Sequence, residues 1–183
     1  LDSAYSTSNL PLRGAKGWLY EGGIRVPMIV KWPEKFSDSS LIVEEPVIST
    51  DFYPSLLEMA GLPARDEQAL DGVSFVPALN GELFNRGPIF WHFPQYSNHG
   101  MQSPGGAVRF GDYKLLEYFE NNTVQLFNLR EDIGERNDLS QTEPGIREEL
   151  RGLLRSWRED VNAQMPPRNP DYDPSQYPHT GLP

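Results

Sequence analysis

The sequence predicts an α+β fold, in which a small antiparallel sheet of about four strands is covered by a C-terminal helix. Two patterns carry this prediction. Between residues 88 and 129, short aromatic and β-branched segments alternate with turn residues, which is typical of sequential hairpins. Between residues 146 and 161, apolar side chains recur every three or four positions, which is typical of a helix that buries one face.

The first part of the chain is expected to hold a strand followed by a helix. Residues 1–11 are polar and rich in turn residues, and they indicate a loop. The apolar, β-branched run from Ile24 to Trp32 favours a strand. Pro27 lacks a backbone N–H, so it should lie at an edge, a bulge or the start of that strand.

Two helical segments are predicted before the sheet. The first covers residues 52–60, with a cap at Thr50 or Asp51 and a stop at Gly61. Its apolar face is expected to hold the following residues: Phe52, Tyr53, Leu56, Leu57 and Ala60. The second is a shorter helical turn at residues 74–80, ended by Gly81.

Four strands are predicted at residues 88–93, 107–110, 113–119 and 124–129. Gly111 and Asp112 suit a two-residue hairpin turn between the second and third strands. The first two strands are separated by residues 94–106, a loop long enough to suggest a functional role. The sheet is therefore expected to be antiparallel.

The C-terminal helix is expected to start near Thr142, as its cap, with Pro144 in the first turn. Its buried stripe is predicted to consist of Ile146, Leu150, Leu153, Trp157 and Val161. The helix should pack over the sheet. Residues 164–183 contain six prolines and indicate extended coil.

Composition limits the partners of this chain. It has 183 residues, of which 38% are hydrophobic, enough for a domain with a core. The net charge of −10 argues against nucleic acid and against an anionic membrane surface. No apolar run approaches the roughly 20 residues that span a bilayer. The chain has no cysteine, which leaves its redox compartment open.

A glycine-rich segment holds the strongest candidate site residue, Lys16. Four glycines occur between Gly14 and Gly23, which indicates a tight loop with positive φ angles or close approach to another group. An ammonium on such a loop can be directed at a sulfate or phosphate oxygen. From these residues alone, a solvated surface turn remains the competing interpretation.

The string Arg13-Gly14-Ala15-Lys16-Gly17, followed by Tyr20-Glu21-Gly22-Gly23-Ile24-Arg25-Val26-Pro27, closely resembles the second signature region of the formylglycine-dependent (type I) sulfatases. That family belongs to the alkaline phosphatase superfamily. The resemblance continues through residues 49–61, 71–74, 111–115, 126–129 and 132–139. Ala15 stands where many members carry glycine.

The resemblance implies a fold and an activity. Residues 1–86 would be the C-terminal end of the larger α/β core, residues 87–163 a subdomain of sheet and helix, and residues 164–183 a proline-rich tail. The full-length protein would be a sulfatase that cleaves a sulfated sugar or an aryl sulfate. Lys16 would contact the sulfate as a catalytic and substrate-binding residue. A periplasmic, secreted or lysosomal location is expected from the family.

The resemblance also implies what this chain lacks. The family's nucleophile is a formylglycine made in a Cys (or Ser)-x-Pro-x-Arg motif, and that motif does not occur here. The family's calcium ligands are missing too, so calcium and formylglycine are expected in the full-length enzyme and no metal in this chain. The sequence thus resembles the C-terminal portion of a sulfatase. Its expected partner is the missing N-terminal catalytic part, without which it should be inactive.

His92 and His99 are candidate substrate-binding residues at the ends of an aromatic segment. One interpretation places them with Tyr96 at the mouth of a sugar-binding cleft; the other makes His92 a packed strand residue and His99 a surface residue. Two histidines without cysteine give no support for zinc. Arg13 is expected to form an ion pair with Glu21 or another acid rather than to contact the anion.

Two other functions remain open from the sequence. One is a non-catalytic carbohydrate-binding module that uses the aromatic sheet and the loop 94–106. The other is a phosphate or phosphonate ester hydrolase of the same superfamily, because tetrahedral anions look alike to a single lysine.

Overall fold

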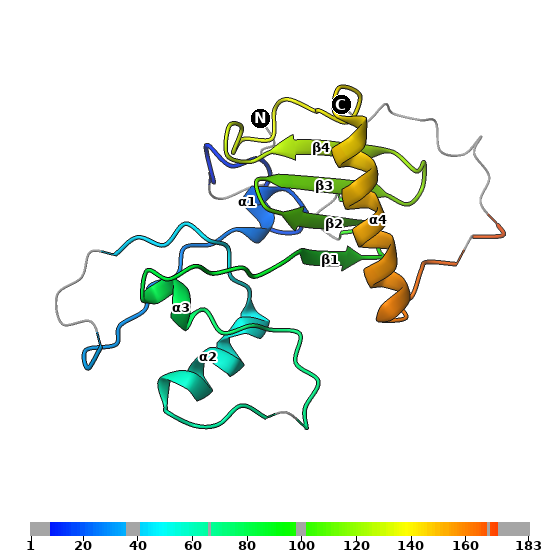
Figure 1. Cartoon of the computed structure of the whole chain (residues 1–183). Helices are drawn as coiled ribbons and strands as arrows, with labels where there is room; N and C mark the ends of the chain where they lie inside the picture. Colours follow the sequence, from blue (N-terminus) through cyan, green and yellow to red (C-terminus); the bar gives the residue numbers. More distant parts are fainter. Residues whose placement is uncertain (1–7, 36–40, 66, 98–101, 168, 172–183) are drawn as a thin grey trace.

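The computed structural model describes residues 8–35, 41–65, 67–97, 102–167 and 169–171. Its centre is an antiparallel sheet with the order β1-β2-β3-β4 (Figure 1). The strands are β1 (Ile89–Phe93), β2 (Gly105–Phe110), β3 (Tyr113–Tyr118) and β4 (Val124–Asn128). The predicted α+β class and the four predicted strands are confirmed.

The hairpin between β2 and β3 turns at Gly111 and Asp112, as predicted. Phe110 pairs with Tyr113, and Gly111 has a φ of 57°. Alternation along the strands then sends side chains to two different cores. One face of the sheet carries Ala107, Leu116 and Phe127, and the other carries Val108, Leu115 and Leu126.

Helix α4 (Pro144–Asp160) covers the second of these faces. Leu150 and Leu154 are buried against the sheet, and Trp157 stacks on Phe90 of β1 with ring centroids 4.9 Å apart. The predicted packing of this helix over the sheet is confirmed. Among the residues that the structure describes, no helix is both long and apolar enough to cross a membrane.

Two details of α4 differ from the prediction. Leu154, which is fully buried, rather than Leu153 lies at the centre of the stripe, and Val161 is about half exposed. Thr142 does not cap the helix, because its hydroxyl donates to the carbonyl oxygen of Leu139. The N-cap position is held by Glu143, without a capping hydrogen bond from its side chain, and Pro144 lies in the first turn as expected.

We expect Leu154→Ala to lower the free energy of unfolding by about 2–5 kcal/mol, because it leaves a cavity between α4 and the sheet. Urea denaturation of the isolated chain measures this loss. Leu83→Ala is the matched control, since Leu83 is 95% exposed and its truncation removes almost no packing. Equal losses for the two leucines would contradict the described core.

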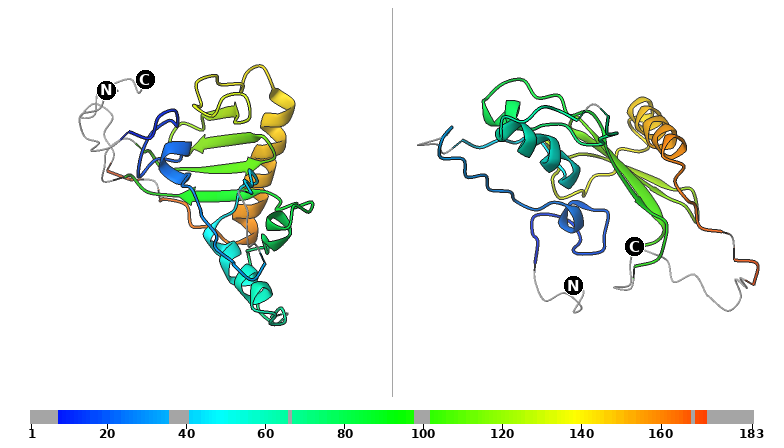
Figure 2. Two further views of the ribbon diagram at one scale, coloured as in Figure 1. Left: turned by 90° about the vertical axis from the view of Figure 1, so that its left-hand side faces the viewer. Right: turned by 90° about the horizontal axis from the view of Figure 1, so that it is seen from below.

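The opposite face of the sheet is covered by the glycine-rich segment, which ends in the short helix α1 (Glu21–Ile24). Leu19 and Tyr20 are buried in one cluster with Ala107, Leu116 and Phe127. Figure 2 shows the sheet between α4 on one side and α1 on the other. The segment that carries Lys16 is therefore built onto the sheet.

The region before the sheet contains η1 (Ser49–Asp51), α2 (Phe52–Met59) and α3 (Val76–Leu79). Both predicted helices are confirmed, with Gly61 and Gly81 at positive φ after them. Asp51 does not cap α2, however. Its carboxylate accepts from the backbone N–H groups of Ile48 and Val73 and pairs with Arg86.

The expected strand from Ile24 to Trp32 is wrong for the described chain. Ile24 belongs to α1, and residues 25–32 form no strand ladder. Val26 is 81% exposed and Ile29 is 94% exposed. A strand needs a neighbour that pairs with its backbone, and the described residues provide none here. Most of the apolar face of α2 is exposed as well.

Candidate functional site: the lysine loop

Lys16 lies on an exposed turn whose backbone geometry depends on glycine. Gly14 and Gly17 have φ angles of 75° and 94°, in the region where residues with a Cβ are strained. The backbone N–H of Trp18 donates to the carbonyl oxygen of Ala15 and closes the turn around Lys16. The lysine loop, defined here as residues 13–20, is thus tightly folded, as predicted, with Lys16 exposed to solvent.

Helix α1 folds back directly onto the lysine loop. The backbone N–H of Gly22 donates to the carbonyl oxygen of Arg13 at 2.7 Å. A Cβ on Gly22 would lie 2.4 Å from the carbonyl oxygen of Gly14, and one on Gly23 would lie 2.2 Å from that of Trp18. These positions exclude side chains, so the two glycines allow α1 to pack on the turn.

Beneath the loop lies a buried charge cluster, formed by Glu21, Lys114 and Glu135. Lys114 Nζ donates a hydrogen bond to Glu21 Oε1 at 2.9 Å and makes an ion pair with Glu135 Oε1 at the same distance. Glu135 Oε2 accepts a hydrogen bond from the backbone N–H of Glu21 at 2.7 Å. All three side chains are almost completely buried. They connect α1, β3 and the segment after β4.

Two arginines add positive charge at the edge of this cluster. Arg25 lies 3.4 Å and Arg109 lies 4.0 Å from Glu21 Oε2. Burial lowers the pKa of Arg109, against the attraction of Glu21. Burial raises the pKa of Glu135, although Lys114 and the hydrogen bond from Glu21 oppose that rise. Removing carboxylates from water therefore has a cost that Lys114 offsets in part.

Arg13 does not make the predicted contact with a carboxylate. Its Nη1 donates to the backbone carbonyl oxygen of Glu135 at 2.8 Å, and its guanidinium lies 4.0 Å from the centre of the Tyr20 ring. The expectation of an ion pair with Glu21 is therefore wrong: Glu21 pairs with Lys114, Arg25 and Arg109. The expectation that Arg13 has a structural contact holds.

Two described residues of the long loop between β1 and β2, Ser97 and Gln102, lie beside the lysine loop. The buried Gln102 side chain accepts a hydrogen bond from the backbone N–H of Leu19 at 2.9 Å. A Cβ on Gly17 would lie 2.8 Å from Ser97 Oγ. Ser97 and Gln102 of the predicted functional loop 94–106 thus lie against Gly17 and Leu19 of the lysine loop, which the sequence alone did not indicate.

His92 lies on the other side of the sheet from Lys16. Its Nε2 is 2.8 Å from the carbonyl oxygen of Gln164, and its ring is near Phe119, over which Arg158 of α4 also lies. The structure thus does not bring His92 together with Lys16. His99 lies outside the described residues. A substrate-binding role for either histidine stays a prediction.

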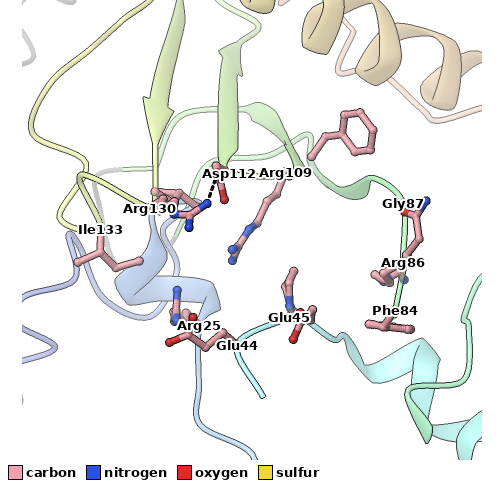
Figure 3. Close-up of a pocket in the computed structure, with 15 residues that line it drawn as sticks. Arg25, Glu44, Glu45, Phe84, Arg86, Gly87, Arg109, Asp112, Arg130 and Ile133 are labelled. Atoms are coloured by element: carbon pink, nitrogen blue, oxygen red, sulfur yellow. Dashed lines mark hydrogen bonds and ion pairs between the residues drawn. The ribbon is translucent and has the colours of Figure 1, made fainter. Parts of the chain in front are cut away.

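A hollow of about 600 Å³ opens beside the charge cluster (Figure 3). Its labelled walls include Arg25, Arg109 and Arg130, and the ion pair between Arg130 and Asp112 crosses one side. A second hollow of about 760 Å³ shares Arg25 and Arg109 and is lined mainly by residues 24–30 and 41–48. Lys16 lines neither hollow, so an anion site at Lys16 must be formed by residues other than those that line these two hollows.

Sequence reasoning missed the roles of Lys114 and Glu135. One signal was present: β3 reads Tyr113-Lys114-Leu115-Leu116, with apolar residues on both faces of the strand. A strand covered on both faces buries every side chain in its middle, so a lysine there requires carboxylate partners. Nothing in the sequence indicated that these partners are Glu21 and Glu135.

Comparison with known proteins identifies the class. A "Sulfatase" from Formosa agariphila is 36% identical over 171 residues, which is 86% of this chain and 31% of the relative. A "Delta 4,5-hexuronate-2-O-sulfatase" from Bacteroides thetaiotaomicron is 33% identical over 95 residues, half of this chain and 19% of that protein. The fold, the lysine loop and these relatives define the C-terminal portion of a sulfatase.

The chain belongs to the family described as N-sulphoglucosamine sulphohydrolase, C-terminal, whose family model matches residues 15–160. The crystal structure of Ps i-CgsB is similar over 84% of this chain and 33% of its own, with a TM-score of 0.70 and 28% identity. The structure of a 2-O GAG sulfatase is similar over 68% of this chain and 27% of its own chain, with a TM-score of 0.53 and 30% identity. The chain thus spans about a third of the first relatives that it matches.

Proposed function

We propose that the full-length protein hydrolyses a sulfuric ester of a sugar or an aryl alcohol, and that Lys16 binds the sulfate. One observation carries this proposal: Lys16 is exposed on a turn whose two flanks are both fixed to the sheet through Glu135. The names of the relatives support the substrate class, because they include a hexuronate-2-O-sulfatase and a human steryl-sulfatase.

In this proposal Lys16 acts through its positive charge. Negative charge on the sulfate oxygens changes as the ester bond breaks, and an ammonium that is already held in place stabilises the charge that develops. A fixed turn avoids the cost of ordering the lysine backbone at that moment. The side chain binds the anion, and Gly14 and Gly17 on either side of it allow the positive φ angles that the turn requires.

Calcium and formylglycine, which the family resemblance implies, do not fit the residues present. The chain has no cysteine, and the string Ser-x-Pro-x-Arg does not occur in it. Among the described residues, no group of three or more carboxylate, histidine or cysteine side chains is placed to hold a metal ion. Both groups are therefore proposed to come from the part of the full-length protein outside this chain.

The same absent part is proposed to cover the exposed apolar segments before the sheet. Residues 25–30 carry Val26 and Ile29, which are almost fully exposed, and α2 exposes Leu56. Monomeric proteins rarely leave contiguous apolar surface in water. An extended segment with free backbone groups can pair with a strand of a larger sheet, which agrees with the expected α/β core.

We expect the isolated chain to release no sulfate above background, because it supplies Lys16 without a nucleophile. The assay follows sulfate release from an aryl sulfate and from sulfated disaccharides, with the full-length protein as the positive control. The full-length protein is also given the matching phosphate esters. Sulfate release by the isolated chain would refute the expectation, and a preference of the full-length protein for phosphate esters would refute the proposed substrate class.

A further inference from the structure

Glu135 contacts Arg13, at the start of the lysine loop, and Glu21, which directly follows its end. On the N-terminal side, its carbonyl oxygen accepts a hydrogen bond from Arg13 Nη1 at 2.8 Å. On the C-terminal side, its carboxylate accepts one from the backbone N–H of Glu21 at 2.7 Å. Lys16 lies between these two points of attachment, so one residue fixes both flanks of the turn that presents it.

The position of Glu135 is itself built into the fold. Its φ of 52° is unusual for a residue with a side chain, and it is fully buried. Its backbone N–H donates to the carbonyl oxygen of Asp132, and the Asp132 carboxylate accepts from the N–H groups of Arg136 and Asn137. Lys114 of β3 then pairs with its carboxylate. Glu135 thus connects the loop to the rigid sheet.

Stability alone is a weak reason for this arrangement. A buried ion pair is often no more stabilising than apolar residues of the same volume, because removing the charges from water has a cost. The raised pKa of Glu135 reflects that cost. Charged hydrogen bonds provide directional attachment, which apolar packing does not. The cluster therefore suits the task of holding a backbone in one conformation.

We propose that Glu135, held by Lys114, is a positioning residue for Lys16. The inference rests on the proposed role of Lys16 in sulfate binding. Glu135 lies beneath the loop and acts through it, so its side chain need not contact substrate. Loss of its carboxylate loosens the α1 flank of the turn, and the ammonium then samples positions away from the sulfate. A misplacement of about 1 Å can lower a rate by about 10²-fold.

The test compares Glu135→Gln with Asp51→Asn in the full-length enzyme. Asp51, like Glu135, is fully buried and forms an ion pair with a basic side chain. Its partners Ile48, Val73 and Arg86, however, lie outside the lysine loop. We expect Glu135→Gln to lower kcat/KM by about 10- to 100-fold at a temperature where both variants are folded. Asp51→Asn should leave kcat/KM near the wild-type value while lowering the melting temperature.

A double-mutant cycle then asks whether Glu135 acts through Lys16. In the Lys16→Ala background, Glu135→Gln should cause no further loss, because there is no ammonium left to misplace. A further loss of the same size, or a folded Glu135→Gln enzyme with wild-type kcat/KM, overturns the inference. An unchanged kcat/KM for Lys16→Ala overturns the proposed role of Lys16 and, with it, this inference. If Glu135→Gln does not fold, Arg13→Met replaces it in the cycle, with the same expected outcomes.

Discussion

Lys16→Ala in the full-length protein is expected to lower kcat/KM by about 10²-fold or more, on the order of 2.7 kcal/mol of transition-state stabilisation. The reason is the loss of the positive charge that the lysine loop presents to the sulfate. Steady-state kinetics with an aryl sulfate, and with a sulfated disaccharide, measure the effect. Protein folding should be unchanged, because the Lys16 side chain is exposed.

Lys35→Ala is the matched control for this experiment. Lys35 is also exposed, but it lies in a turn outside the lysine loop. Its loss changes the net charge by the same amount and should leave kcat/KM within a factor of about two. If both alanine variants lose activity equally, or neither does, Lys16 has no specific role in sulfate binding.

Lys114→Met is expected to lower the free energy of unfolding by about 3–5 kcal/mol, because it leaves two buried carboxylates without their shared cation. Glu21 and Glu135 each lie 2.9 Å from the Lys114 ammonium. Denaturant unfolding at pH 7.5 measures the loss. Lys35→Met removes an exposed lysine and is expected to change stability by less than about 0.5 kcal/mol.

The destabilisation by Lys114→Met should depend on pH. Burial raises the pKa of Glu135 in the folded state, and Lys114 opposes that rise. A raised folded pKa means stability that is present at low pH and is lost as pH rises through that pKa. Without Lys114 the pKa of Glu135 rises further, so the difference between variant and wild type should be smaller at pH 5 than at pH 7.5. A difference that is independent of pH would contradict the described cluster.

The sheet and α4 could be predicted because their signals are local. Paired aromatic and β-branched runs, the Gly111-Asp112 turn and a helical stripe of apolar residues each specify one element without knowledge of distant residues. The prediction of which residues are buried was less precise than the prediction of the helix itself. Periodicity alone does not decide between Leu153 and Leu154, which differ by about 100° around the helix, and the sheet contacts make Leu154 the buried one.

The segment from Ile24 to Trp32 shows where such local signals fail. Its residues favour extended backbone, and Arg25 is extended with φ −96° and ψ 124°. A strand, however, is defined by hydrogen bonds to a neighbour, which no local pattern supplies. Burial of an apolar side chain also depends on a partner, and without one Val26 and Ile29 are exposed.

The candidate site divides in the same way. Lys16 could be proposed as a site residue because the glycines around it and the sulfatase resemblance lie in one short string. The cluster beneath it could not, because Lys114 is 93 positions and Glu135 is 114 positions from Glu21. Contacts at that separation follow from the tertiary fold. Charged residues are also usually exposed, so their burial is unexpected without a structure.

The structure of the full-length enzyme with sulfate bound tests the central claim most directly. If the lysine loop presents the anion-binding cation, Lys16 Nζ lies about 2.7–2.9 Å from a sulfate oxygen, as charge-assisted hydrogen bonds do. Glu135 then still contacts Arg13 and Glu21, as in the chain described above. A sulfate bound by other cations, with the Lys16 ammonium directed into solvent, would contradict the account.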